Sequence, residues 1–317
     1  MEGCHSADIS NVTSYDAMTV AIVTFEAFGG MWINALIVSV ICVVWIKNKT
    51  LNSIEKILLF LGFSRFWYLC LAWVNYFLSV IYPNYIYFHP IFPLVQSTQS
   101  FFICSDFWFS ACLCVFYCIK IANFRNSFLI YLKEKIDRMV PWLLLGSELF
   151  SLMIGILDYE LLDKGLRNKA TLTCHGIIWK ANIRIEENFF QIYFITAFLF
   201  ATSFTAVILS ALLLLFSLWR HKHNMQTNSM KDVSMDAHIK AMKSTLSFLV
   251  MYSINFISLI LGLVYSMKNE NDMMFPIFLI QYAFPSLHSL ILIFSNPKLK
   301  KILLRILPCV NCKNCIK

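Results

Sequence analysis

The chain has 317 residues, of which 59% are hydrophobic and only 14% are charged. So little polar surface cannot cover a water-soluble globule of this length, which excludes an ordinary soluble protein. The net charge of +8 would suggest nucleic-acid binding if it were spread over one surface, but its distribution along the chain argues against that interpretation.

Long apolar stretches recur along the whole chain. A bilayer core about 30 Å thick requires roughly 20 apolar residues in a helix. Stretches of at least that length occur at about 18–46, 54–82, 91–121, 138–158, 188–218, 240–267 and 273–295. They are continuously apolar, which favours helices over the alternating strands of a barrel. The sequence therefore predicts an all-α membrane protein, a seven-transmembrane helix bundle that forms a single domain over residues 1–317.

Lys and Arg residues are sorted to alternate connections between these stretches. The connections after the first, third and fifth stretches, together with the C-terminal tail, hold 19 of the 26 Lys and Arg residues. The positive-inside rule places these segments in the cytoplasm and the N-terminus outside the cell. The tail, residues 297–317, is then cytoplasmic. We expect the basic side to face cytosol and anionic membrane lipid, and no nucleic acid.

Both ends of the chain carry candidate modification sites. Asn11 starts an Asn-Val-Thr glycosylation sequon on the predicted outer side. Cys4 and Cys174 are the clearly extracellular cysteines, and a disulfide between them is one possibility. Near the C-terminus, a short basic amphipathic helix is expected at 298–307. Three cysteines follow it, Cys309, Cys312 and Cys315; palmitoylation is favoured over metal binding because a fourth ligand is missing.

Ionisable residues at membrane depth are costly and therefore mark candidate functional positions. Arg65 in the second stretch and Asp106 in the third would neutralise each other if their helices are adjacent. Asn34 and the pair His288-Ser289 lie at comparable depth. We expect one polar cluster that joins the first, second, third and seventh helices, either as packing contacts alone or as part of a switch.

Glu148 in the fourth stretch has no obvious partner.

Other classes of membrane protein lack support in the sequence. A transporter would show broken half-helices in matched halves, and a channel would show a pore loop or rings of charge. No nucleophile–base set, metal cluster or phosphate-binding loop is found, so we expect no enzyme activity, no cofactor and no metal.

Several motifs at the helix ends carry a resemblance to a known family. They are LLFLGFSRFW at 58–67, FYCIKIANF at 116–124, LLLLFSLWRHKHNMQ at 212–226, KDVSMDAHIKAMKSTLSFLVMY at 231–252 and PSLHSLILIFSNPKLKK at 285–301. With these motifs the chain closely resembles the type 2 taste receptors, the bitter receptors, across all seven helices. The rhodopsin-type Asp-Arg-Tyr triplet is absent after the third helix.

The resemblance implies a G-protein-coupled receptor of the plasma membrane that binds small, often toxic organic compounds and activates a gustducin-type heterotrimeric G protein. It assigns the core polar network to Asn34, Arg65, Asp106, Tyr252, His288 and Ser289. It assigns G-protein coupling to Tyr117, Lys120, His238 and Lys243. A type 1 vomeronasal-like receptor, or a small polytopic transporter, is the alternative.

The expected ligand pocket departs from the better-known members of that family. A frequent Trp contact of the third helix is Gln99 here, a Ser is Asp106, a switch Tyr is Asn255, and an acidic contact of the seventh helix is Phe278. We expect a mostly apolar pocket open to the outside. Its predicted lining is Gln99, Ile103, Asn255, Phe278, Gln281 and Tyr282. Each of these side chains could equally serve interhelical packing.

Overall fold

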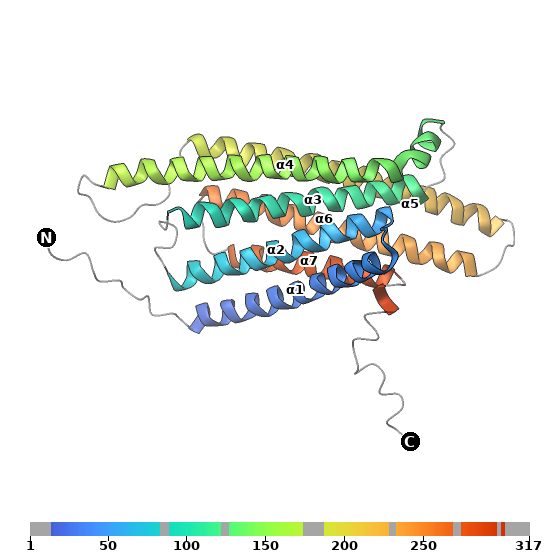
Figure 1. Cartoon of the computed structure of the whole chain (residues 1–317), viewed down its shortest axis with the longest axis horizontal. Coiled ribbons are helices and arrows are strands. Elements are labelled where there is room, and N and C mark those ends of the chain that lie inside the picture. The colour runs from blue at the N-terminus through green and yellow to red at the C-terminus, as the bar shows by residue number, and fades with distance from the viewer. Residues whose placement is uncertain are drawn as a thin grey trace, which may run out of the picture.

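The computed structural model describes residues 14–82, 89–121, 127–173, 187–227, 233–268, 274–296 and 299–301. Within these ranges the chain forms seven long helices and no strand, which confirms the predicted fold class (Figure 1). The helices are α1 Ser14–Asn48, α2 Ser53–Ile81, α3 Ile91–Ile121, α4 Ser127–Thr173, α5 Glu187–Thr227, α6 Val233–Lys268 and α7 Met274–Ser295. Each contains a segment long and apolar enough to cross a membrane.

Three helices extend well past the apolar stretches that predicted them. The helix expected at 138–158 is α4, which runs from Ser127 to Thr173, and both α5 and α6 are also longer than expected. A helix satisfies its own backbone hydrogen bonds, so it can continue into water after its apolar segment ends. Lys133 and Lys135 therefore lie on the first turns of α4, not in a loop between α3 and α4.

Local sequence signals set the boundary between α1 and α2. Lys49 has φ 60°, a left-handed conformation that ends α1. Asn52 caps α2: its side chain accepts a hydrogen bond from the Glu55 amide at 2.8 Å, and the Glu55 carboxylate accepts one from the Asn52 amide at 3.0 Å. This reciprocal capping box gives hydrogen-bond acceptors to two backbone amides at the start of α2, where no preceding helical turn supplies them.

The helices pack as a ring with one helix outside it. Contacts run from α1 to α2, α3, α5, α6, α7 and back to α1, while α4 packs mainly on the outer side of α3. Consecutive helices run in opposite directions along the long axis (Figure 1). Alternate helix ends therefore meet, and the described Lys and Arg residues at 47, 56, 120, 133 and 220 gather at one end of the bundle. We call this the basic end, and its opposite the far end.

Most of the interior of the bundle is apolar. One cluster of buried hydrophobic residues fills the basic end, a second lies between α3, α5, α6 and α7, and a third lies between α1, α2 and α7 at the far end. Large apolar side chains also point outward; Phe25 is 81% exposed and Trp142 is 74% exposed. Such an outward apolar surface is expected of a multi-pass membrane protein.

Candidate functional site

Arg65 is the centre of a buried hydrogen-bond network in the middle of the bundle. It lies on α2 and has no exposed surface. Its Nε donates to Asp106 Oδ1 on α3 at 2.6 Å, and its Nη2 donates to Ser110 Oγ at 3.1 Å. Ser110 also lies close to the Asp106 carboxylate. The buried charge of the guanidinium is thereby paired and hydrogen-bonded, as its depth requires.

The same guanidinium reaches α7 and, through it, α1. Nη1 donates to Ser289 Oγ at 3.0 Å, and Ser289 Oγ donates to Asn34 Oδ1 at 2.7 Å. Nη2 lies 2.6 Å from His288 Nδ1. Arginine has no acceptor, so Nδ1 must accept this bond, and His288 is the neutral tautomer protonated at Nε2. Asn34 Nδ2 completes the chain by donating to the Gly30 carbonyl of its own helix at 2.8 Å.

The structure thus brings together five of the six residues expected in the core network, and they join α1, α2, α3 and α7. Tyr252 of α6 is fully buried but belongs to an aromatic layer beside the network. Its ring lies 5.2 Å from that of Phe107 and 6.0 Å from that of Phe284, and its hydroxyl is 3.5 Å from Ser203 Oγ on α5. Tyr252 therefore links α5 and α6 to the network through ring packing.

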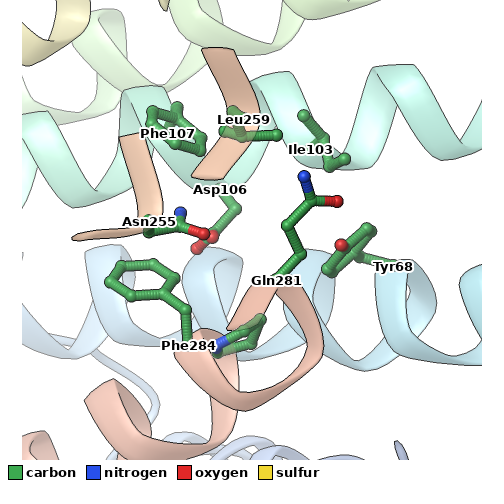
Figure 2. Close-up of a pocket in the computed structure, with 9 residues that line it drawn as sticks. Tyr68, Ile103, Asp106, Phe107, Asn255, Leu259, Gln281 and Phe284 are labelled. Atoms are coloured by element: carbon green, nitrogen blue, oxygen red, sulfur yellow. The ribbon is translucent and has the colours of Figure 1, made fainter. Parts of the chain in front are cut away.

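A small cavity lies directly against this network, on its far-end side. It is lined by Tyr68, Ile103, Asp106, Phe107, Asn255, Leu259, Gln281, Phe284 and Pro285. Figure 2 shows Asp106, Asn255, Gln281 and Tyr68 converging on it from four different helices. Its volume of about 10 Å³ leaves room for about one water molecule. Asp106 is the residue that belongs to both the cavity and the network.

Three of the six residues expected to line a ligand pocket line this cavity, namely Ile103, Asn255 and Gln281. The other three lie elsewhere. Gln99 accepts a hydrogen bond from Asn75 Nδ2 at 3.2 Å, Phe278 packs against Tyr76, and the Tyr282 hydroxyl donates to the Ala72 carbonyl at 2.6 Å. All three contacts tie α3 or α7 to α2 near the far end, so these residues pack between helices in this conformation.

Other lining residues were missed by the sequence reasoning, although helical spacing could have found them. Phe107 follows Ile103 by four positions, Leu259 follows Asn255 by four, and Phe284 follows Gln281 by three. Residues three or four apart share one face of a helix. Tyr68 bears the same relation to Arg65 on α2.

A second set of polar contacts joins α3 to α4. Glu148, for which the sequence suggested no partner, accepts a hydrogen bond from Ser105 Oγ at 3.5 Å. Asp158, the last residue of the fourth apolar stretch, lies within α4, is buried and is close to Ser100 of α3. These contacts explain how α4 is held on the outside of the ring.

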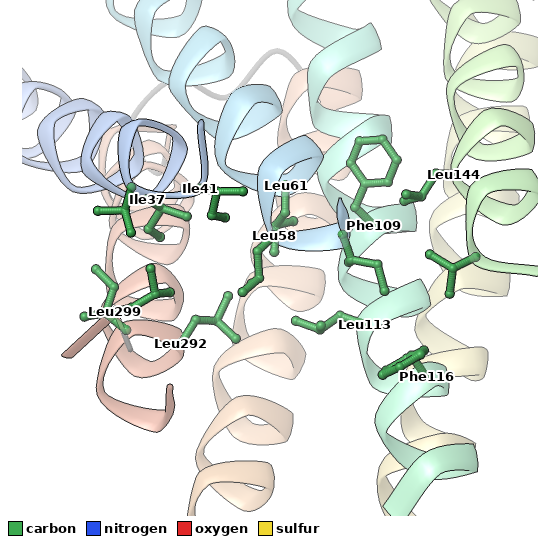
Figure 3. Packing of buried hydrophobic residues seen from close by; sticks show 14 of the residues in the cluster. Ile37, Ile41, Leu58, Leu61, Phe109, Leu113, Phe116, Leu144, Leu292 and Leu299 are labelled. Atoms are coloured by element: carbon green, nitrogen blue, oxygen red, sulfur yellow. The ribbon is translucent and has the colours of Figure 1, made fainter. Parts of the chain in front are cut away.

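At the basic end, Tyr117 and Lys120, the two residues of α3 expected to contact the G protein, pack against other helices of the bundle. Lys120 Nζ forms an ion pair with Asp137 Oδ2 of α4 at 2.5 Å, and Asp137 Oδ1 accepts from Ser53 Oγ of α2 at 2.7 Å. Tyr117 packs against an apolar cluster that continues through Phe116 and Leu113 towards α2 and α7 (Figure 3). His238 and Lys243 fall on α6, but their side chains lie outside the described part of the structure.

The remaining candidate positions also lie outside the described residues. They are Asn11, Cys4, Cys174 and the three C-terminal cysteines, Cys309, Cys312 and Cys315. Of the segment expected to form an amphipathic helix, only residues 299–301 are described, and these are helical. Leu299 is buried against the apolar cluster of the basic end.

Comparison with known proteins gives a match over nearly the whole chain. The family model for taste receptor protein (TAS2R) matches residues 12–311. Taste receptor type 2 member 40 of Gallus gallus is 33% identical over 308 residues, which cover 96% of this chain and 97% of that protein. Taste receptor type 2 member 2 of Homo sapiens is 31% identical over 297 residues, 91% of this chain and 95% of that protein. Taste receptor type 2 member 41 of Pan paniscus is 33% identical over 294 residues, with coverages of 88% and 91%.

Proposed function

Because this chain belongs to the type 2 taste receptor family, the bitter taste receptors, we propose that it binds small organic agonists in the cavity between α2, α3, α6 and α7. The family is one of receptors and not of enzymes, and it implies G-protein coupling. The observation that carries the proposal is the position of the cavity, which shares Asp106 with the buried Arg65 network.

Agonist binding requires a change in the helices around the cavity. In the present conformation the cavity holds about one water molecule, whereas a small-molecule site typically encloses about 300 Å³ or more. An agonist therefore binds better to a conformation in which α3, α6 and α7 stand further apart. A ligand that prefers one conformation shifts the population towards it. Gln99, Phe278 and Tyr282 join the pocket in this proposal when the far end opens.

The Arg65 network supplies a route from the cavity to the basic end. A shift of Asp106 alters the hydrogen bonds of Arg65, and these bonds hold α1 and α7 through Ser289 and Asn34. The aromatic layer around Tyr252 connects the same region to α5 and α6. In this mechanism the network has two arrangements, one favoured without agonist and one favoured with it.

The basic end is the proposed docking face for a gustducin-type G protein. Tyr117 and Lys120 on α3, with His238 and Lys243 on α6, would meet the C-terminal helix of the Gα subunit, whose C-terminus favours positive charge. The ion pair of Lys120 with Asp137 must then open or rearrange on coupling. This assignment rests on family resemblance together with the charge of the basic end.

The same charge distribution supports the proposed orientation in the plasma membrane, with the basic end in the cytoplasm and the N-terminus outside. Asn11 is then accessible for glycosylation, and Cys309, Cys312 and Cys315 can be palmitoylated at the inner membrane surface. The outward apolar side chains, such as Phe25 and Trp142, contact membrane lipid in this arrangement.

The family match favours a taste receptor over the vomeronasal-type receptor and the transporter. The decisive experiment is expression with a promiscuous Gα subunit and measurement of intracellular calcium during exposure to a panel of bitter compounds. We expect calcium responses to some compounds and none in cells that lack the receptor. Substrate flux without any calcium response would contradict the proposal and support the transporter.

A further inference from the structure

Asn255 is a buried residue whose side-chain amide faces the cavity and has no hydrogen-bond partner within the described part of the chain. The residue is only 4% exposed and lines the cavity. Its backbone carbonyl accepts from Ser258 Oγ at 2.8 Å, but among the described residues its side-chain amide makes no hydrogen bond. A polar group that faces a cavity and has no protein partner takes its hydrogen bonds from a water molecule or a ligand in that cavity.

The Tyr68 hydroxyl and the Asp106 carboxylate meet the same small space. Tyr68 is 4% exposed, and no protein partner for its hydroxyl is present in the described part of the chain. Asp106 Oδ1 accepts a hydrogen bond from Arg65 Nε at 2.6 Å on its network side. A carboxylate has about four lone-pair positions, so Asp106 retains acceptor capacity towards the cavity. All three residues line this cavity, and Figure 2 shows the Gln281 side chain between Tyr68 and the other two.

These groups define the chemistry of what fits between them. An occupant must donate a hydrogen bond to Asp106, and the Asn255 amide and the Tyr68 hydroxyl each offer both a donor and an acceptor. A hydroxyl both donates and accepts, whereas an ether oxygen only accepts and an ammonium only donates. The volume of about 10 Å³ admits one heavy atom of this kind, the size of a water molecule.

Because of its charge, an ammonium group is less favourable than a hydroxyl group at this position in the cavity. The single negative charge of Asp106 is already balanced by Arg65, which is fully buried and in direct contact with it. A ligand cation would place a second positive charge beside Arg65 in a site of low dielectric constant, which is unfavourable. A neutral donor gains the strong bond to the carboxylate without that repulsion.

We propose that Asp106, Asn255 and Tyr68 form a subsite for one uncharged hydroxyl group at the inner end of the cavity, and that this subsite selects hydroxylated, uncharged agonists. A water molecule fills the subsite until an agonist hydroxyl displaces it. The rest of the agonist then lies towards the far end, past Ile103, Leu259 and Gln281. The inference rests on the proposed function, because it concerns the ligand of that same cavity.

The first test needs no known agonist. Asn255→Leu replaces an amide that has no protein partner in the described part of the chain with an apolar side chain of similar size. We expect it to lower the melting temperature of the purified receptor in detergent by less than about 2 °C, if at all, because only a bound water molecule loses its partner. Asn75→Leu is the matched control, because the Asn75 amide donates to Gln96 at 2.9 Å and to Gln99 at 3.2 Å. We expect Asn75→Leu to lower the melting temperature. A fall of about 2 °C or more for Asn255→Leu would show that its amide has a partner in the protein and would overturn the subsite.

The second test uses matched triplets of aromatic bitter compounds that differ only in a primary alcohol, a methyl ether or a primary ammonium group. In the calcium assay we expect the alcohols to be the most potent, by about tenfold or more over the ethers. We expect Asn255→Leu to reduce that preference to about twofold or less. Equal potency of alcohol and ether, or greater potency of the ammonium compounds, would contradict the subsite.

The two proposals fail in different ways. If other bitter compounds give calcium responses while none of the triplet alcohols does, the cavity binds agonists but the hydroxyl subsite is wrong. If no bitter compound gives a response although the receptor reaches the cell surface, the proposed function itself is wrong, and the subsite falls with it.

Discussion

Arg65 shows how a single charge at membrane depth organises its surroundings. The guanidinium has several donors in a fixed plane, and the structure directs them to Asp106, Ser110, Ser289 and His288. Lysine could not replace this geometry, because its ammonium is a compact point charge without the planar fork of donors. The position therefore specifies which faces of α2, α3 and α7 meet in the bundle.

Removing one partner of this ion pair should be strongly destabilising. Arg65→Ala leaves the Asp106 charge unpaired, Asp106→Ala leaves the Arg65 charge unpaired, and breaking a buried pair costs about 3–5 kcal/mol. We expect each single variant to show a lower melting temperature and less receptor at the cell surface. The double variant should lose clearly less than the sum of the two, because it leaves no lone charge. Additive losses would show that the two residues do not interact.

The pairing of Arg65 with Asp106 could be anticipated because charges in a membrane must be neutralised, whichever way the helices turn. The lining of the cavity could be derived only in part. Helical spacing tells which residues share a face, but not how that face is rotated towards its neighbours. Gln99 and Phe278 were therefore expected in the pocket, whereas in the structure they pack against α2. Tyr68, which lies on α2, lines the cavity but was not expected there.

At the scale of helices, α1 packs tightly against both α2 and α7 at a glycine. A Cβ atom built on Gly30 would lie 2.2 Å from Ser286 Oγ and 2.6 Å from Leu69 Cδ1, whereas a Cβ on Gly29 would meet nothing within 4 Å. The carbonyl of Gly30 also accepts the hydrogen bond of Asn34. The absence of a side chain at position 30 thus lets α1 reach both α2 and α7 where the polar network begins.

These adjacent glycines offer a matched pair of substitutions. Gly30→Ala and Gly29→Ala gain the same helix propensity, so their difference in stability reports the packing at position 30. We expect Gly30→Ala to be less stable than Gly29→Ala by about 1–3 kcal/mol, because Leu69 is buried and must move. The measurement is thermal unfolding of both purified variants. Adding Ser286→Ala to Gly30→Ala should restore part of the loss; a failure to do so would place the strain on Leu69 alone.

At the scale of the whole molecule, the seven helices and their two chemically different ends could be predicted from hydrophobicity and charge. The physical reason is that the bilayer imposes both constraints on the sequence: a minimum apolar length and a preferred side for Lys and Arg. The ends of the helices could not be predicted in this way, because neither constraint acts outside the membrane. The extra turns of α4, α5 and α6 lie in that unconstrained region.

Orientation in the membrane can be tested by two glycosylation sequons that lie on opposite sides in the proposed topology. Asn11 precedes α1, whereas Asn48, followed by Lys49 and Thr50, ends α1 at the basic end. Glycans are added only on the side that becomes extracellular. We therefore expect a glycosidase to change the electrophoretic mobility of the wild-type receptor and of Asn48→Gln, but not of Asn11→Gln. Loss of the mobility change in Asn48→Gln instead would invert the topology, place the basic end outside the cell and remove the proposed docking face for the G protein.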